Sequence, residues 1–362
     1  MFNSEFVTRR ESLTGLLPTH EVDAILITAA PNVRYLSGFT GSNSAMLISR
    51  EGQSILFTDP RYEIQAAQQT DCRVVVTRKP LTQEAAGAVK RLKIRKLGFE
   101  LTRLSFESHD TLHSQLAGSS ELKPVRSAVE SLRMIKSDPE LAAIRRSVET
   151  NSKAFDQALR KIKPGRTSEA GLAAEIEYLQ RKLGAEGPSF ESIVAAGDRS
   201  ALPHATPGTR KLKPDDLLLI DMGATQDGYA SDMTRVVNLG KRAAKAKRYY
   251  KAVLEAQLAA IDAVRAGVPV ARVDRAARNV LKAHGLDKLF VHSTGHGLGL
   301  EIHEAPKIGK KDKSRLAEGM AITIEPGVYL EGEFGIRIED TVVVTRQGCE
   351  ILTPTSKQFL EI

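Results

Sequence analysis

Two aspartates beside a predicted turn are the first residues in this sequence that could do chemistry. Two apolar, strand-like runs flank Asp227-Gly228, a dipeptide typical of a two-residue hairpin turn. That turn pairs Gln226 with Tyr229 and places Asp221 and Asp232 diagonally on one face of the hairpin. Two like charges on so apolar a face are costly unless a cation lies between them. Since an isolated strand Asp is usually exposed or caps a turn, this pair alone leaves a metal site and a structural role open.

A glycine-rich segment supplies candidate imidazole ligands. His292, His296 and His303 fall in one short stretch of a chain that has eight histidines. The glycines between them let a ligand or another backbone approach closely. A lone histidine is more often structural, whereas three in such a stretch favour metal binding or proton transfer.

A second predicted hairpin carries two glutamates. Glu325 and Glu339 lie at equal distances from Gly332, so their side chains can oppose each other across the hairpin. An ion pair with Arg337 at a sheet edge would explain one buried Glu in such β-rich surroundings. One ion pair with Arg337 does not account well for two glutamates, so the presence of both Glu325 and Glu339 favours a metal site.

Together these segments offer four carboxylates and one imidazole: Asp221, Asp232, His296, Glu325 and Glu339. Carboxylate oxygens suit hard divalent ions such as manganese, and imidazole also suits cobalt, iron or zinc. Four carboxylates carry too much charge for one ion, so we expect two, with manganese as the first expectation. Two ions about 3.5–4 Å apart can share a hydroxide and stabilise a tetrahedral intermediate.

Two regions with different patterns must position these residues. Residues 1–130 alternate strand and helix signals, which predicts an α/β domain. The expected strands are 22–28, 45–49, 54–58, 73–77, 96–100 and 122–125, and the expected helices are 60–69, 82–92 and 106–116. Residues 131–362 predict an α+β domain of hairpins covered by helices. Its expected helices are 138–162, capped by Asp138 and Pro139, then 168–183, 243–266 and 270–284.

Composition limits the class of protein. A chain of 362 residues with 41% hydrophobic residues can form two cored domains. No apolar run approaches the length that spans a bilayer, and no signal-peptide core follows the N-terminus. Cys72 and Cys349 lack zinc-site spacing, which favours a reducing, cytoplasmic compartment. The net charge of +8 raises nucleic acid as a partner, but the densest basic stretch, 241–251, favours a solvated helix face and no binding motif stands out.

The motifs resemble, in order and spacing, those of the pita-bread metallopeptidases, in the branch of Xaa-Pro aminopeptidases and Xaa-Pro dipeptidases (prolidases). The matching segments are 220–224, 231–235, 292–304, 324–329 and 335–340. Residues 32–42 resemble a creatinase-type N-terminal domain, so the resemblance covers essentially the whole chain. It implies a creatinase-like α/β domain over 1–130, a pita-bread α+β catalytic domain over 131–362, and a homodimer.

The resemblance also implies roles beyond the five metal ligands. His204 matches the substrate-pocket histidine, His292 a further pocket histidine, and His303 the histidine that contacts the scissile peptide and its oxyanion. Glu325 would carry a proton to the proline nitrogen.

Two further residues are implied as supports of the metal site. Arg337 and Asp340 would steady Glu339 and the bridging hydroxide.

The implied activity is hydrolysis of the bond between a first residue and a following proline, in short proline-containing peptides, by a metal-activated hydroxide. Residues 32–42, 58–66 and 189–204 favour an Xaa-Pro aminopeptidase. Lys307 lies where some prolidases carry an Arg that holds the product carboxylate, so an Xaa-Pro dipeptidase is the alternative. A non-catalytic binding protein and a creatine hydrolase are disfavoured because all five ligand positions are filled. A methionine aminopeptidase would share the metal site but would not need the first 130 residues.

Overall fold

The computed structural model describes residues 4–240 and 244–362, and the chain divides into two compact units, Met1–Arg133 and Met134–Ile362. Ala243, at the start of an expected helix, and Lys241 and Arg242 of the basic stretch lie outside the described residues. Among the described helices, none is both long and apolar enough to cross a membrane.

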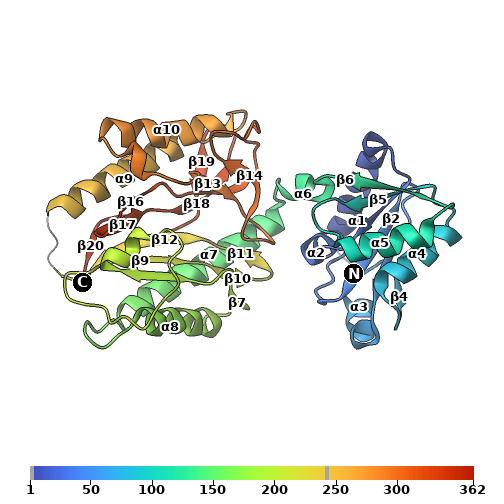
Figure 1. The fold of residues 1–362 in the computed structure, drawn as a ribbon, viewed down its shortest axis with the longest axis horizontal. Helices are drawn as coiled ribbons and strands as arrows, with labels where there is room; N and C mark the ends of the chain where they lie inside the picture. Colours follow the sequence, from blue (N-terminus) through green and yellow to red (C-terminus); the bar gives the residue numbers. More distant parts are fainter. Residues whose placement is uncertain (1–3, 241–243) are drawn as a thin grey trace. The chain divides into compact units, whose positions relative to one another are not determined.

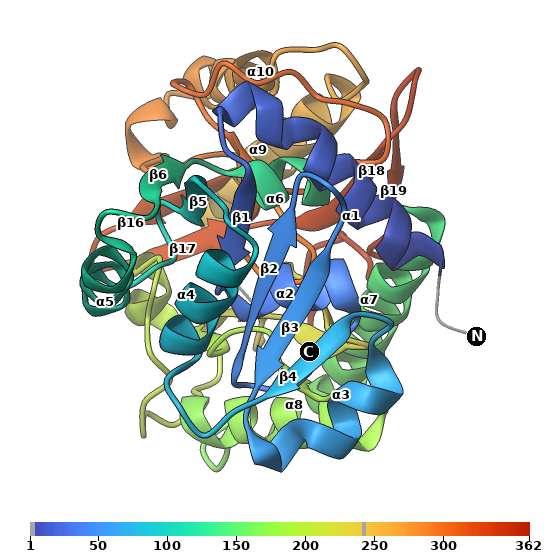
Figure 2. The same cartoon turned by 90° about the vertical axis from the view of Figure 1, so that its right-hand side faces the viewer.

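A six-stranded mixed sheet, ordered β4-β3-β2-β1-β5-β6, forms the centre of the first unit (Figures 1 and 2). Its strands are β1 (Ala24–Ile27), β2 (Ser44–Ser49), β3 (Ser54–Thr58), β4 (Arg73–Val76), β5 (Lys96–Glu100) and β6 (Glu121–Val125). The expected hairpin of β2 and β3 is present, and β2 also pairs antiparallel with β1, while the other pairs are parallel. All four residues of β1 are buried, as expected for a central strand of a covered sheet.

The helices of the first unit include the three that the pattern predicts and three that it misses. Helices α4 (Leu81–Arg91) and α5 (Phe106–Leu116) bury apolar side chains of the sheet, and Asp59 caps the turn before α3 (Glu63–Gln69). The unexpected helices are α1 (Ser4–Leu16), α2 (Ala30–Ser37) and α6 (Ala128–Arg133). Helix α2 has Pro31 in its first turn, where proline suits a helix, and it carries residues 32–37 of the segment 32–42.

The second unit places strands between two pairs of helices (Figure 1). Helices α7 (Asp138–Leu159) and α8 (Glu169–Lys182) lie on one side, and α9 (Ala244–Asp262) and α10 (Val270–Ala283) on the other. The strands are β7 (Gly187–Pro188), β8 (Ile193–Ala196), β9 (Leu217–Met222), β10 (Ala224–Gln226), β11 (Tyr229–Ala230), β12 (Met233–Asn238), β13 (Gly295–Gly297), β14 (Glu304–Ile308), β15 (Ala321–Ile324), β16 (Gly327–Leu330), β17 (Phe334–Arg337), β18 (Asp340–Val344), β19 (Cys349–Ile351) and β20 (Leu360–Glu361). The two larger sheets have the orders β20-β12-β9-β8 and β14-β13-β15-β18-β19.

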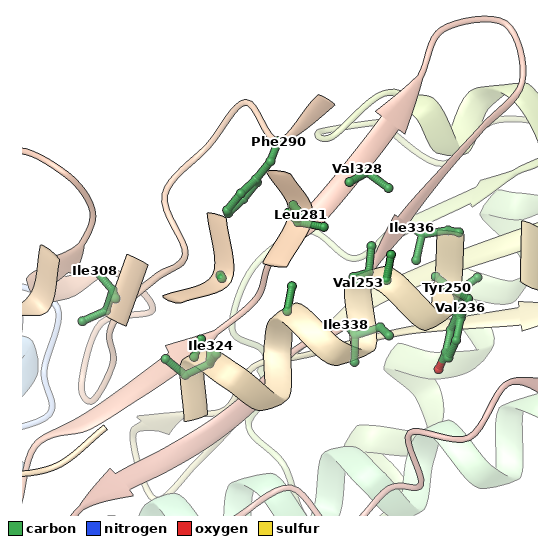
Figure 3. Close-up of a cluster of buried hydrophobic side chains, with 14 of the residues drawn as sticks. Val236, Tyr250, Val253, Leu281, Phe290, Ile308, Ile324, Val328, Ile336 and Ile338 are labelled. Atoms are coloured by element: carbon green, nitrogen blue, oxygen red, sulfur yellow. The ribbon is translucent and has the colours of Figure 1, made fainter. Parts of the chain in front are cut away.

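Strand β9 shows how the central sheet serves both helix pairs. Leu218 and Ile220 pack with α7 and α8, whereas Leu217 and Leu219 pack in the cluster of α9 and α10. Figure 3 shows part of this second cluster. Because side chains alternate along a strand, Asp221 falls on the α9–α10 face.

Two helix predictions need correction. Ser137, not Asp138, caps α7: its side chain accepts from the Glu140 backbone, and the Glu140 side chain accepts from the Ser137 backbone. Asp138 therefore lies inside the first turn of a capping box. Helix α9 ends at Asp262, four residues before the predicted end, and its Lys245 forms an ion pair with Glu333, as in a solvated helix face.

Candidate metal centre

The first predicted hairpin has the predicted register. Gln226 faces Tyr229 across the turn, and φ is positive at both turn residues, Asp227-Gly228 (53° and 78°). The same register resumes where β9 pairs with β12. Asp221 and Asp232 therefore lie on one face, both nearly inaccessible to solvent.

The second hairpin brings the two glutamates face to face. β15 pairs with β18 and β16 with β17 in one continuous register, which places Glu325 opposite Glu339. Gly332 provides the turn between them, with a φ of 73°. The alternative of an edge-strand ion pair with Arg337 is wrong, because this buried guanidinium donates from Nη2 to Asp221 Oδ2.

His296 joins the two hairpins. It lies on β13, with its Nε2 3.5 Å from both Asp232 Oδ2 and Glu325 Oε1. Its Nδ1 donates to the Gly297 carbonyl oxygen at 3.0 Å, which leaves the Nε2 lone pair directed at the carboxylates. Burial lowers the pKa of His296 to about 4, so the ring is in the neutral form that binds metals.

The donor set fits divalent cations. Three of the candidate ligands each have a buried carboxylate oxygen without a hydrogen-bond partner among the described residues: Asp221 Oδ1, Asp232 Oδ1 and Glu339 Oε1. One ligand atom from each of Asp232, His296 and Glu339 lies within 4.8 Å of the others. Burial and then the neighbouring carboxylates raise the pKa of Asp232 and Glu339, and burial raises that of Glu325 to about 7. An unpartnered buried carboxylate is costly, and a bound cation would remove that cost.

Arg337 also hydrogen-bonds Tyr329 and Thr234, two residues for which the sequence predicts no role. Its Nη1 donates to the Tyr329 hydroxyl at 2.6 Å, and its Nε donates to Thr234 Oγ1 at 3.1 Å. Thr234 in turn donates to Glu339 Oε2 at 2.6 Å. A Tyr and a Thr in apolar strands resemble ordinary core residues, so spacing carried no signal for them.

The Tyr329 hydroxyl continues this network to His292. His292 Nδ1 donates to the Ser293 carbonyl oxygen at 2.8 Å, so its Nε2 accepts from Tyr329, at 2.9 Å. Burial lowers the pKa of His292 to about 4 and raises that of Tyr329 to about 12, which keeps both groups neutral near pH 7.

Asp340 supports the site from outside it. Its carboxylate pairs with Arg235 at 2.7 Å and with Lys357 at 2.6 Å, and Arg235 also donates to the Glu339 carbonyl oxygen. The expectation that Arg337 and Asp340 steady Glu339 stays a prediction, and both residues are linked to Glu339 through one intermediate residue. Asp340 holds the Glu339 backbone through Arg235, and Arg337 reaches the carboxylate only through Thr234.

A cavity of about 810 Å³ opens onto these groups. All ten site residues predicted from the sequence line it: His204, Asp221, Asp232, His292, His296, His303, Lys307, Glu325, Arg337 and Glu339. The His303 ring lies edge-on to that of His296, with centroids 4.4 Å apart. Burial lowers the pKa of His303, against the opposing effect of Asp221. Apolar side chains such as Phe190 and Val291 complete the wall.

Comparison with known proteins decides the family. A family model described as metallopeptidase family M24 matches residues 142–346, and one described as the creatinase/prolidase N-terminal domain matches residues 9–135. The chain belongs to metallopeptidase family M24. This M24 chain is 36% identical to an Xaa-Pro dipeptidase of Pyrococcus horikoshii, over 97% of this chain and 98% of the relative. The resemblance and the fold class predicted from the sequence are thus confirmed.

Two solved structures extend the comparison of the M24 chain. An Xaa-Pro dipeptidase from Bacillus anthracis superposes with a TM-score of 0.95 at 37% identity, covering 99% of this chain and 100% of that one. An X-Pro aminopeptidase from Thermotoga maritima gives a TM-score of 0.88 at 39% identity, covering 94% and 98%. The P. horikoshii and B. anthracis relatives are both named Xaa-Pro dipeptidase. These names favour the dipeptidase alternative over the aminopeptidase that residues 32–42, 58–66 and 189–204 favour.

Proposed function

We propose that this metallopeptidase is an Xaa-Pro dipeptidase. The observation that carries the choice is Lys307, whose side chain shares one cavity with His303 and the carboxylate cluster. Among the described residues, its ammonium group has no hydrogen bond or ion pair, so it can receive the free carboxylate of a dipeptide. The names of the P. horikoshii and B. anthracis relatives support the same choice.

Two divalent ions, manganese first and cobalt, zinc or iron as alternatives, would be held by Asp221, Asp232, His296, Glu325 and Glu339. When bound, such ions lower the pKa of water and polarise a carbonyl group. The donors support this assignment because three of their oxygens are buried without a partner among the described residues.

The chain's own groups supply the remaining steps. His303, in the cavity beside His296, donates a hydrogen bond to the scissile carbonyl oxygen, where negative charge develops. Glu325 carries a proton to the proline nitrogen, which lacks an N–H of its own in the peptide. His204 lines the same cavity and binds the substrate.

His292 has a narrower role than the other pocket histidines. Both of its ring nitrogens are engaged, by Ser293 and Tyr329. It therefore contacts the substrate through ring carbon atoms and contributes shape rather than a hydrogen bond. Arg337 positions Asp221 and does not need to touch the substrate.

An Xaa-Pro aminopeptidase is the second candidate. The T. maritima structure, at 39% identity, carries that name and shares the fold over nearly the whole chain. The two candidates differ in whether the substrate ends at the proline, and therefore in whether Lys307 meets a carboxylate.

The test compares an Xaa-Pro dipeptide with the matching Xaa-Pro-Xaa tripeptide on manganese-loaded enzyme, with Lys307→Met and Lys307→Arg beside the wild type. We expect preference for the dipeptide, a loss of about tenfold in kcat/KM on the dipeptide in Lys307→Met, and retention in Lys307→Arg, as one charged contact contributes. Preference for the tripeptide with no effect of Lys307→Met would establish the aminopeptidase. Cleavage of neither peptide, repeated with cobalt and zinc, would overturn both.

We also propose a cytoplasmic homodimer. The dimer is what the family resemblance implies, and light scattering that gives one chain mass at micromolar concentration would contradict it. Cys72 and Cys349 are both free thiols, which supports a reducing compartment.

A further inference from the structure

A buried ion pair lies beside the loop that carries His303. Lys136 Nζ is 3.0 Å from Glu304 Oε2, with side chains that are only 1% and 6% exposed. Glu304 follows His303 directly in the chain and lines the same cavity. None of the reaction steps proposed above uses this pair.

Both partners are attached to other parts of the catalytic unit. The Lys136 backbone donates to the Gly319 carbonyl oxygen at 3.0 Å, just before β15, the strand that leads to Glu325. The second carboxylate oxygen of Glu304 accepts from the Glu301 backbone at 3.1 Å. The ion pair therefore links the start of one ligand-bearing strand to the segment that precedes His303.

Gly299 shows how closely the loop folds around this carboxylate. A Cβ at Gly299 would lie 2.8 Å from one Glu304 oxygen and 2.9 Å from the other, so the loop can close on the carboxylate only without a side chain there. The Gly299 carbonyl oxygen also accepts from the Ala230 backbone at 2.7 Å, two residues before Asp232. Residues 299–304 are thus joined at one end to the segment just before Asp232 and, at the other end, through Lys136 to the segment just before β15.

We propose that the Lys136–Glu304 pair positions His303 by holding the 299–304 loop against the metal-ligand strands. Burial of two charges costs about as much free energy as their attraction returns, so such a pair is a poor source of stability. The pair does fix one geometry, because Lys136 Nζ contacts one Glu304 oxygen and the Glu301 backbone donates to the other. His303 needs that geometry to place its donor at the developing oxyanion. This inference rests on the role proposed for His303.

The experiment uses the double variant Lys136→Met/Glu304→Gln, which removes both charges together and avoids leaving one buried charge unpaired. The exposed pair of Arg346 and Glu318 gives the matched control, Arg346→Met/Glu318→Gln. Each double variant is made in the wild type and in His303→Ala. Steady-state kinetics on the Xaa-Pro dipeptide, metal content and hydrogen exchange of residues 298–304 are measured for each protein.

We expect Lys136→Met/Glu304→Gln to lower kcat about 10- to 100-fold, with little change in KM and full metal content. Exchange should rise in residues 298–304 and not elsewhere, and Lys136→Arg alone should retain most activity. In the His303→Ala background the double variant should cause no further loss of kcat. The control pair should change neither activity nor exchange.

Equal losses of kcat in both backgrounds would overturn the inference, since the pair would then act on another group. Unchanged exchange in residues 298–304 would overturn it as well. If the wild type cleaves no Xaa-Pro substrate, the proposed function fails, and the exchange measurement alone decides whether the pair holds the loop.

Discussion

The imidazole of His303 lies edge-on against that of His296, with 4.4 Å between the ring centroids and 67° between the ring planes. One ring carries a nitrogen directed at the carboxylates, and the other is offered to a substrate in the cavity. His303 is a candidate hydrogen-bond donor to the substrate, and His296 is a candidate metal ligand. Because the two functions belong to different residues, mutation can separate them.

His303→Ala should lower kcat on an Xaa-Pro dipeptide by about 10²- to 10³-fold, as loss of one oxyanion donor does. Metal content should stay at the wild-type level, because no ligand is removed. Kinetics and metal analysis on the same sample check both parts, with His303→Gln, which keeps a donor, as the control. Loss of metal in His303→Ala would contradict the separation of roles.

In the metal-free protein, the contribution of Glu325 to stability should fall as the pH rises from about 4.5 to about 7, while His292 and His296, whose pKa values burial lowers to about 4, act in the opposite direction. Burial raises the pKa of Glu325 from 4.5 to about 7 in the fold, so the folded state binds a proton more tightly than the unfolded chain. That contribution is complete below pH 4.5 and disappears as the pH passes through about 7. At about 1.36 kcal/mol per pKa unit it is on the order of 3 kcal/mol.

Thermal unfolding of chelator-treated protein at several pH values measures this loss. The variant Glu325→Gln cannot ionise and keeps both histidines, so the stability of the wild type relative to this variant should fall over the range. Adding manganese at pH 7 should raise the melting temperature, because bound cations stabilise the ionised carboxylates. A stability difference between the wild type and Glu325→Gln that stays constant between pH 4.5 and 7 would refute the prediction.

Arg337→Met should destabilise the metal-free protein by about 3–5 kcal/mol, because it leaves the buried Asp221 carboxylate without its cation. Tyr329→Phe removes only a hydroxyl from the same network and should cost about 1–2 kcal/mol. Denaturant unfolding with and without manganese checks this order. Manganese should recover part of the loss in Arg337→Met, since Asp221 would regain a cationic partner, and no recovery would argue against Asp221 as a ligand.

In the first unit, Asn32→Ala should lower the free energy of unfolding by about 3–5 kcal/mol, because Arg133 and Glu100 each lose a buried hydrogen-bond partner. Asn32 is fully buried, accepts from Arg133 at 2.6 Å and donates to Glu100 at 2.6 Å. The exposed Asn279→Ala is the control and should stay within about 0.5 kcal/mol of the wild type. Denaturant unfolding that gives similar losses of unfolding free energy for Asn32→Ala and Asn279→Ala would contradict this prediction.

Sequence reasoning succeeded where contacts are local. The Asp227-Gly228 turn determines the pairing of its own strands, and Gly332 centres the second hairpin, so the facing carboxylates follow from counting residues. The convergence of His204 and His303 on one cavity came from the family resemblance and not from spacing. Helix α2 escaped prediction because it has only 8 residues, too few for its apolar residues to show a helical period.

The supports of the site are long-range and left no local pattern. Arg337 meets an Asp221 that is 116 positions away, and Lys136 meets a Glu304 that is 168 positions away. A single Arg or Lys in the sequence is equally compatible with solvent or with any buried acid. Only the packing of distant strands selects the partner.

The division of the four carboxylates between two hairpins affects how the centre can assemble and how it can be lost. Each hairpin can close on its own from neighbouring residues, so each carboxylate pair can form before the distant strands meet. A cation shared between Asp232 and Glu339 would then join segments that no disulfide joins, much as a cross-link does. One residue inserted into either strand beside a turn would rotate a carboxylate to the opposite face and abolish the centre with every ligand still present in the sequence.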